Sequence, residues 1–160
     1  MDDRRCPLPV PWEDWMKIDW KNPSCLVTEH FTVKELIWLR KWNRLANEAD
    51  GLNTGIKLAL VETAHLAEDV RAVLGVPLMI TSFFRPTSYS YLVGSNPSSP
   101  HCHGRAFDFT TIPNMSIEDA KAKLRPALRA IDARMEKGTT TWIHIDSFPV
   151  GPSGREFVPL

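Results

Sequence analysis

The sequence has 160 residues, a length that fits one domain with its own hydrophobic core. Hydrophobic residues make up 43% and charged residues 24%, which is ordinary globular composition and excludes the disordered and fibrous classes. Lys plus Arg and Asp plus Glu each number 19, so the formal net charge is +0 and no long-range field favours nucleic acid or an anionic membrane surface.

The N-terminal stretch begins with acidic residues and is interrupted by prolines, so it lacks the basic start and apolar run of a secretion signal. No run of about 18 apolar residues is present, and we therefore expect no membrane span. The Cys count of 3, at irregular spacing, argues against a disulfide framework and against a zinc site of the CxxC type. These features predict synthesis in the cytoplasm without a signal peptide.

Residues 1–30 are rich in Pro and Trp and predict an N-terminal arm packed on a domain that spans residues 31–160. The arm carries Trp12, Trp15 and Trp20. Stacking on carbohydrate is one interpretation of these rings. Aromatic anchors that hold an irregular segment on the core are the commoner one, and we prefer it.

Two helices are predicted next along the chain. A capping box of Thr32 and Glu35 marks the start of the first, whose apolar positions continue to about Glu48. Apolar positions at helical spacing in residues 56–74 predict the second. His65 lies within that helix without another ligand type at metal spacing, so we leave it out of the site.

The rest of the chain alternates between strand and loop patterns, with one more helix. Strands are predicted at residues 77–83, 105–110 and 139–146. Residues 87–100 are expected to be mainly loop, and a third helix should start at residues 116–119, kink or split at Pro126 and end at Gly138. This order predicts an α+β fold with a small, mainly antiparallel sheet and helices packed on it, although the strand order is not readable.

Candidate metal ligands occur in two separate segments. His101 and Asp108 stand on either side of a glycine turn that enters a predicted strand, so both can face one cavity. His144 and Asp146 alternate with isoleucines in the last strand and therefore share one face of it. Taken alone, a His-x-Asp strand is more often a hydrogen-bonded pair than a metal site, but the two segments together strengthen the metal interpretation.

Two imidazoles and one carboxylate leave the fourth position of a tetrahedral zinc ion open. Structural zinc sites usually close all four positions, often with Cys, whereas an open position is typical of catalysis. Zinc in such a site polarises a substrate carbonyl and makes water a better nucleophile near neutral pH, which are the two needs of amide hydrolysis.

The pattern S-x-H-x-x-G-x-A-x-D at residues 99–108, followed by H-x-D at residues 144–146, resembles the signature of the D-alanyl-D-alanine carboxypeptidase and L-alanyl-D-glutamate endopeptidase family of zinc peptidases. The upstream segments EHFTVKEL and LAEDVRAVLGVPLMITSFFRP are also similar to that family, so the resemblance spans roughly residues 29–148. It implies a hedgehog/DD-peptidase-like fold and a peptidoglycan stem peptide as substrate.

Residue by residue, the resemblance implies that His101, Asp108 and His144 ligate Zn2+. It also implies that Arg85 faces the carbonyl or carboxylate of the substrate as a fixed cation, a role that the planar guanidinium suits. From the residues alone, an ordinary surface arginine is an equal alternative. Ser99 is implied as a substrate contact or as a support of the ligands.

The general base is the point where the resemblance fails. Several members of the family carry Glu or Asp three residues before the last zinc histidine, whereas this chain has Thr141, whose hydroxyl cannot accept the proton of water near neutral pH. The candidates are Asp146, His103 and Glu118, in that order. Asp146 can instead orient a zinc histidine, and His103 can instead be a solvent-facing loop residue.

Together with these features, the resemblance implies a zinc metallopeptidase, either a carboxypeptidase or an endopeptidase, that cuts D-amino-acid-containing bonds of the bacterial cell wall. A chain without an export signal must reach the wall by lysis, by injection or by another route. A phage origin, with the protein released by lysis or carried as part of a phage particle, is one inference. The alternatives are a non-catalytic zinc-binding module that binds the wall or builds a phage particle, and a zinc amidase with another substrate. No nucleic-acid partner is expected, and the oligomeric state is not readable.

Overall fold

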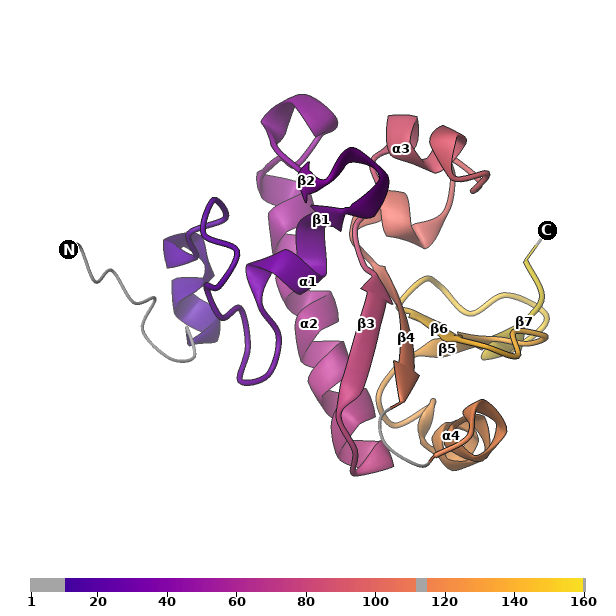
Figure 1. Cartoon of the computed structure of the whole chain (residues 1–160). Helices are drawn as coiled ribbons and strands as arrows, with labels where there is room; N and C mark the ends of the chain where they lie inside the picture. Colours follow the sequence, from indigo (N-terminus) through magenta and orange to yellow (C-terminus); the bar gives the residue numbers. More distant parts are fainter. Residues whose placement is uncertain (1–10, 112–114, 160) are drawn as a thin grey trace.

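A five-stranded sheet and one long helix form the frame of the protein in a computed structural model that describes residues 11–111 and 115–159 (Figure 1). In spatial order the strands are β3 (Leu78–Ser82), β4 (Ala106–Thr111), β6 (Ile143–Asp146), β5 (Arg134–Glu136) and β7 (Glu156–Phe157). Neighbouring strands run antiparallel, except that β5 and β7 are parallel. The predicted α+β class is therefore confirmed.

The long helix α2 (Thr54–Leu74) lies alongside β3 and β4 (Figure 1). It begins where the Asn53 side chain accepts a hydrogen bond from the backbone amide of Ile56, and it ends at Gly75 in the left-handed conformation. The apolar stripe that the sequence predicted is buried and comprises Leu60, Val61, Ala64, Ala67, Val70 and Leu74. Periodicity and capping thus predicted this helix within two residues of its start.

The first helix is much shorter than predicted. The capping box of Thr32 and Glu35 is present, but α1 (Val33–Ile37) ends after five residues. The chain then forms a small hairpin of β1 (Trp38–Leu39) and β2 (Arg44–Leu45), which turns at Asn43 in the left-handed conformation. The expectation of a helix to Glu48 was wrong because this turn, which Asn adopts readily, reverses the chain.

The remaining helices are short. They are α3 (Thr87–Leu92), α4 (Ile117–Leu124) and the 3-10 turns Trp12–Lys17, Arg40–Trp42, Glu48–Asp50, Pro100–His103 and Arg125–Ala127. The segment predicted as loop at residues 87–100 therefore contains a helix. Pro126 splits the third predicted helix as expected, but the chain does not stay helical up to Gly138. Asp132 has a φ of 49°, which reverses the chain into strand β5 instead.

The described part of the arm, residues 11–30, touches the domain through tryptophans. Trp15 and Trp20 pack partly buried against the core, and the ring of Trp12 meets His65 edge-on at 5.6 Å. Residues 1–10 of the predicted arm lie outside the described residues. Cys25 is fully buried and disulfide-bonded. This corrects the expectation, drawn from the odd number of cysteines, that disulfide bonds play no part in the fold.

No helix within residues 11–111 and 115–159 combines the length and the apolarity that a bilayer crossing requires.

The turn at Gly104, just before strand β4, packs directly against α2. Gly104 has a φ of +67°, and a Cβ placed there would lie 3.1 Å from both the backbone oxygen of Ile56 and Cγ of Leu60. The hydroxyl of Thr63 donates a 2.8 Å hydrogen bond to the carbonyl of Gly104. The turn is therefore held against α2 so closely that only glycine fits without displacement.

We expect Gly104→Ala to destabilise the protein more than Gly94→Ala, a matched control at a φ of +70° with open space around it. The control should lower the free energy of unfolding by about 1 kcal/mol through backbone strain alone. Crowding against α2 should add about 1–3 kcal/mol at Gly104. Urea unfolding measures both values, and equal losses would show that α2 does not constrain this turn.

Candidate metal centre

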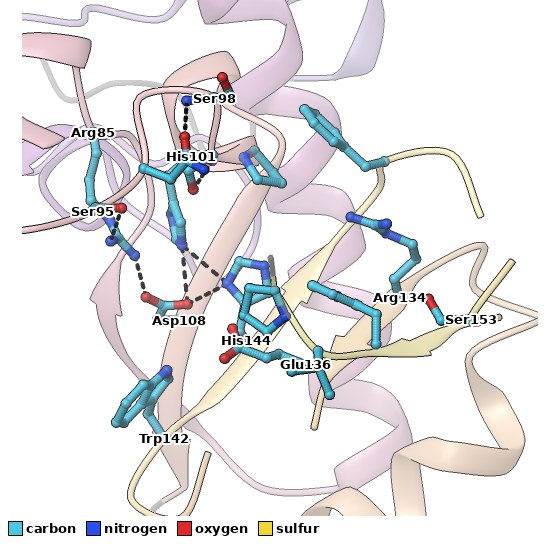
Figure 2. Close-up of a pocket in the computed structure, with 17 residues that line it drawn as sticks. Arg85, Ser95, Ser98, His101, Asp108, Arg134, Glu136, Trp142, His144 and Ser153 are labelled. Atoms are coloured by element: carbon cyan, nitrogen blue, oxygen red, sulfur yellow. Dashed lines mark hydrogen bonds and ion pairs between the residues drawn. The ribbon is translucent and has the colours of Figure 1, made fainter. Parts of the chain in front are cut away.

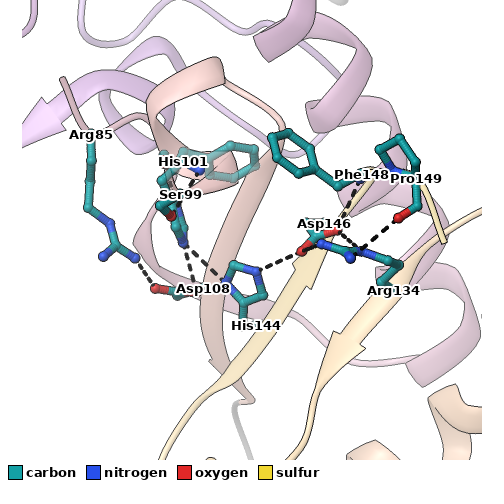
Figure 3. A network of polar contacts seen from close by, with 10 residues as sticks. Arg85, Ser99, His101, Asp108, Arg134, His144, Asp146, Phe148 and Pro149 are labelled. Carbon is teal, nitrogen blue, oxygen red and sulfur yellow. Dashed lines mark hydrogen bonds and ion pairs between the residues drawn. The ribbon is translucent and has the colours of Figure 1, made fainter. Parts of the chain in front are cut away.

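The candidate centre lies on one face of the sheet, where β4 and β6 pair (Figure 3). Asp108 on β4 is the register partner of His144 on β6. Side chains of such partners point to the same face, with Cβ atoms about 4.5–5.5 Å apart. His101 comes from the 3-10 turn Pro100–His103, which Ser99 caps through a 3.4 Å hydrogen bond from the His101 amide. Strand pairing and one capped turn thus bring together groups that lie far apart in sequence.

Three potential ligand atoms converge on one point. Asp108 Oδ1 lies 3.1 Å from His101 Nε2 and 2.7 Å from His144 Nδ1, and these two nitrogens are 3.2 Å apart. All three side chains are buried. Among the described residues they form the group of His, Cys, Asp and Glu side chains that can hold a metal ion.

Both histidines are held in one orientation by partners on the far side of their rings. His101 Nδ1–H donates to the carbonyl of Phe83, which leaves Nε2 as the atom that faces the centre. His144 Nε2–H donates to Asp146 Oδ2 at 3.1 Å, which leaves Nδ1 facing the centre. A ring nitrogen bonded to a carbonyl or carboxylate in this way is the usual arrangement for a metal-binding imidazole, because it sets the tautomer.

Asp108 is held by Arg85. The Arg85 guanidinium donates from Nη2 to Asp108 Oδ2, from Nε to Ser82 Oγ at 2.9 Å and from Nη1 to Ser95 Oγ at 3.3 Å. Its side chain is 17% exposed and borders the pocket above the centre. Arg85 therefore lines the pocket and fixes the second oxygen of Asp108, while its contact with a substrate stays a prediction.

The charge state of the metal-free centre follows from burial and these contacts. Burial lowers the pKa of His101. Burial also lowers that of His144, but hydrogen bonds with Asp108 and Asp146 outweigh it and raise the pKa of His144 to about 9. Burial raises the pKa of Asp108, but the charges and hydrogen bonds of the two histidines hold it well below its usual range. At neutral pH, His144 is a cation, Asp108 an anion and His101 neutral.

This donor set fits a zinc ion. Neutral His101 presents the lone pair of Nε2 toward the carboxylate oxygen of Asp108, so two acceptors face each other at 3.1 Å. A cation between them relieves that repulsion. Tetrahedral zinc with bonds of about 2.0–2.1 Å separates its ligand atoms by about 3.3 Å, so the observed spacing of 2.7 to 3.2 Å needs only a small expansion.

The other acidic and basic candidates from the sequence lie elsewhere. Asp146 is fully buried, and both its oxygens accept hydrogen bonds from Arg134, at 2.7 and 2.9 Å. It does not border the pocket, so its position suits an orienter of His144 and argues against a general base. His103 and Glu118 are exposed and outside the pocket, as is Thr141. The ring of His103 lies beside that of another aromatic residue, not beside the centre.

The centre opens into a cavity of about 550 Å³ (Figure 2). Polar residues of the loop before the centre line it, and Trp142, Phe148 and Phe157 supply aromatic surface. Arg134 and Glu136 also border the cavity, and the sequence interpretation missed both. Their only local signal was the alternation around buried Met135, in a strand of three residues that the helix pattern concealed.

Replacing Asp146 by Asn should weaken zinc binding about 10- to 100-fold, because the amide no longer fixes the proton on His144 Nε2 as a carboxylate does. Asp132→Asn is the matched control, since Asp132 is exposed and Asn tolerates its left-handed backbone. Competition with a chromophoric chelator measures both affinities. An unchanged zinc affinity in Asp146→Asn would remove the orienting role.

Zinc affinity should rise with pH. Because His144 holds a proton up to a pKa of about 9, zinc must displace it at neutral pH, and the apparent affinity should increase about tenfold per pH unit and level off above about 9. Calorimetry in buffers of different ionisation enthalpy should find about one proton released per zinc bound. An affinity that stays flat between neutral pH and 9 contradicts the assigned charge of His144.

A comparison with protein families connects this geometry to known proteins. The family model described as Peptidase M15 matches residues 29–146, which include all three potential ligands. Searches of curated proteins and of solved structures give no match. The match covers most of the chain and agrees with the family that the sequence signature resembles. The chain belongs to the peptidase M15 family, whose members are zinc-dependent metallopeptidases.

Proposed function

We propose that the protein is a zinc peptidase that hydrolyses D-amino-acid-containing peptide bonds of peptidoglycan and that its fold is hedgehog/DD-peptidase-like. The observation that carries this proposal is the convergence of His101 Nε2, Asp108 Oδ1 and His144 Nδ1 at the base of an open cavity, in a chain of the M15 family. The sequence signature at residues 99–108 and 144–146 supports the cell-wall substrate.

Each side chain of the centre has a distinct role in this proposal. His101, Asp108 and His144 hold the zinc ion, which when bound supplies a Lewis acid that polarises the scissile carbonyl and makes water a better nucleophile. Asp146 keeps the proton on His144 Nε2 and so keeps Nδ1 available as a ligand. Arg85 holds Asp108 and places a permanent positive charge at the pocket wall, where the carbonyl oxygen gains negative charge in the transition state.

The cavity has the size and lining of a peptide-binding site. About 550 Å³ lies within the usual range of about 300–1,000 Å³ for ligand pockets, which suits a short segment of a stem peptide. Ser99 and the polar residues before it in the segment 95–99 offer hydrogen bonds to peptide groups. Trp142 also lines the cavity, is 41% exposed and offers an apolar surface. We propose Ser99 and Arg85 as substrate contacts.

The protein is proposed to act on the wall after lysis or as part of a phage particle.

Incubation with purified muropeptides should yield cleaved products when zinc is present and none after treatment with a chelator, with activity restored by added zinc. Mass spectrometry of the products identifies whether a terminal residue or an internal bond is cut. Peptides with all-L residues provide the comparison for stereochemistry.

Two histidine variants sharpen this test. His101→Ala should lose zinc and at least 100-fold in activity, because one ligand is gone. His103→Ala, only two positions away but exposed and outside the cavity, should keep both. A wild-type protein that binds zinc and leaves every muropeptide intact would contradict the peptidase proposal and favour a non-catalytic zinc module.

A further inference from the structure

The hydrolysis proposed above needs a group that accepts the proton of the attacking water. Thr141, at the position where relatives carry an acid, is exposed and outside the cavity. Among the described residues that border the cavity, the acids are Asp108 and Glu136. Asp108 is occupied on both oxygens, by the two histidines and by Arg85. Glu136 is therefore the remaining carboxylate.

Strand register places Glu136 in the same row as the centre. β5 pairs with β6 so that Arg134 is opposite Asp146 and Met135 is opposite Ile145. One further step along the two antiparallel strands brings Glu136 opposite His144. On the other side of His144, β4 contributes Asp108 to the same row. Cross-strand partners share a face, so Glu136, His144 and Asp108 project to the same side of the sheet.

The Arg134–Asp146 ion pair provides an independent check on this face assignment. Arg134 and Glu136 are two residues apart in one strand and so point to the same side. Arg134 reaches Asp146, which lies on the same face of β6 as His144. Figure 2 shows Glu136 beside His144, on the side of the cavity where the centre lies.

The carboxylate of Glu136 is available for proton transfer. It makes no hydrogen bond or ion pair with another described residue, unlike Asp108 and Asp146, which are each held by an arginine. The residue is half-buried and borders the cavity, so its oxygens are open to a substrate and to water. A buried carboxylate with a structural role would have its partners in place.

We propose that Glu136 is the general base of the hydrolysis, in the role for which this chain lacks an acid at Thr141. This inference rests on the peptidase function proposed above. The oxygen of water forms a bond to the scissile carbonyl carbon while one proton of that water passes to Glu136. The C–N bond then breaks, its electron pair stays on nitrogen, and the amine takes the proton back from Glu136. Peptide and water become acid and amine, and Glu136 is regenerated.

The test compares zinc-loaded full-length wild type with Glu136→Gln, which keeps shape and removes the base. We expect kcat on muropeptides to fall about 10²- to 10⁴-fold with KM nearly unchanged. Zinc affinity and Tm should match the wild type, since Glu136 is not a ligand. Glu62→Gln, an exposed position on α2, is the matched control and should behave as wild type. Retained kcat in Glu136→Gln overturns the proposal, as does a loss of zinc affinity that accounts for the lost activity.

A second readout does not depend on turnover. A phosphinic peptide, which mimics the tetrahedral state, should bind to the wild type with uptake of about one proton and to Glu136→Gln with almost none, as calorimetry in two buffers measures. Equal proton uptake overturns the role of Glu136. Glu136→Asp, which keeps a carboxylate, should retain more activity than Glu136→Gln, and the reverse order contradicts the proposal.

These outcomes separate the two proposals. A wild type that neither cleaves muropeptides nor binds the phosphinic peptide overturns the peptidase function and this inference with it. A wild type that cleaves muropeptides while Glu136→Gln cleaves them equally well overturns only the role of Glu136.

Discussion

The pairing of Asp108 with His144 across β4 and β6 is the constraint on which the centre depends. Side chains alternate along a strand, so a slip of one residue would turn His144 to the opposite face and replace it with an isoleucine. Ile143 and Ile145 prevent that slip, because both are fully buried on the other face of β6. The apolar core therefore determines the register, and the register brings the ligand atoms together.

The buried charges around this pair alternate in sign. In the metal-free protein, Arg85, Asp108, protonated His144, Asp146 and Arg134 form a continuous series in which each member contacts the next. Burying any one of these charges alone would cost several kcal/mol, whereas each carboxylate here lies between two cations. Zinc would take the place of the proton on His144, so this position in the series holds a cation both before and after the metal binds. This explains how a centre built for a cation remains folded before the cation arrives.

Part of this arrangement could be predicted from the sequence. The ligand segments have strong local signals, namely a glycine turn between His101 and Asp108 and a strict alternation around His144, and the structure brings the three side chains together. The long helix α2 could also be predicted, from its apolar positions at helical spacing and from the glycine that ends it. The first helix was predicted to be too long, because the apolar positions after α1 are compatible with a helix as well as with the hairpin that forms.

Glu136 could not be identified in the same way. Its strand has three residues and continues a helical pattern, and its position beside His144 depends on the spatial order of strands, with β6 between β4 and β5. That order is set by packing across the whole sheet and leaves no local trace in the sequence. Sequence patterns here identified side chains that lie on regular elements with clear periodicity, and missed one that is positioned by topology.

X-ray absorption spectroscopy of the zinc-loaded protein tests the central claim most directly, because it reports ligand types and distances. We expect a first shell of nitrogen and oxygen at about 2.0–2.1 Å, with the outer-shell scattering of two imidazoles. Cys102 adjoins His101 in sequence, but its sulfur lies 3.1 Å from Ser90 Oγ and does not border the cavity. A sulfur ligand at about 2.3 Å, or scattering from fewer than two imidazoles, would contradict a centre made by His101, Asp108 and His144.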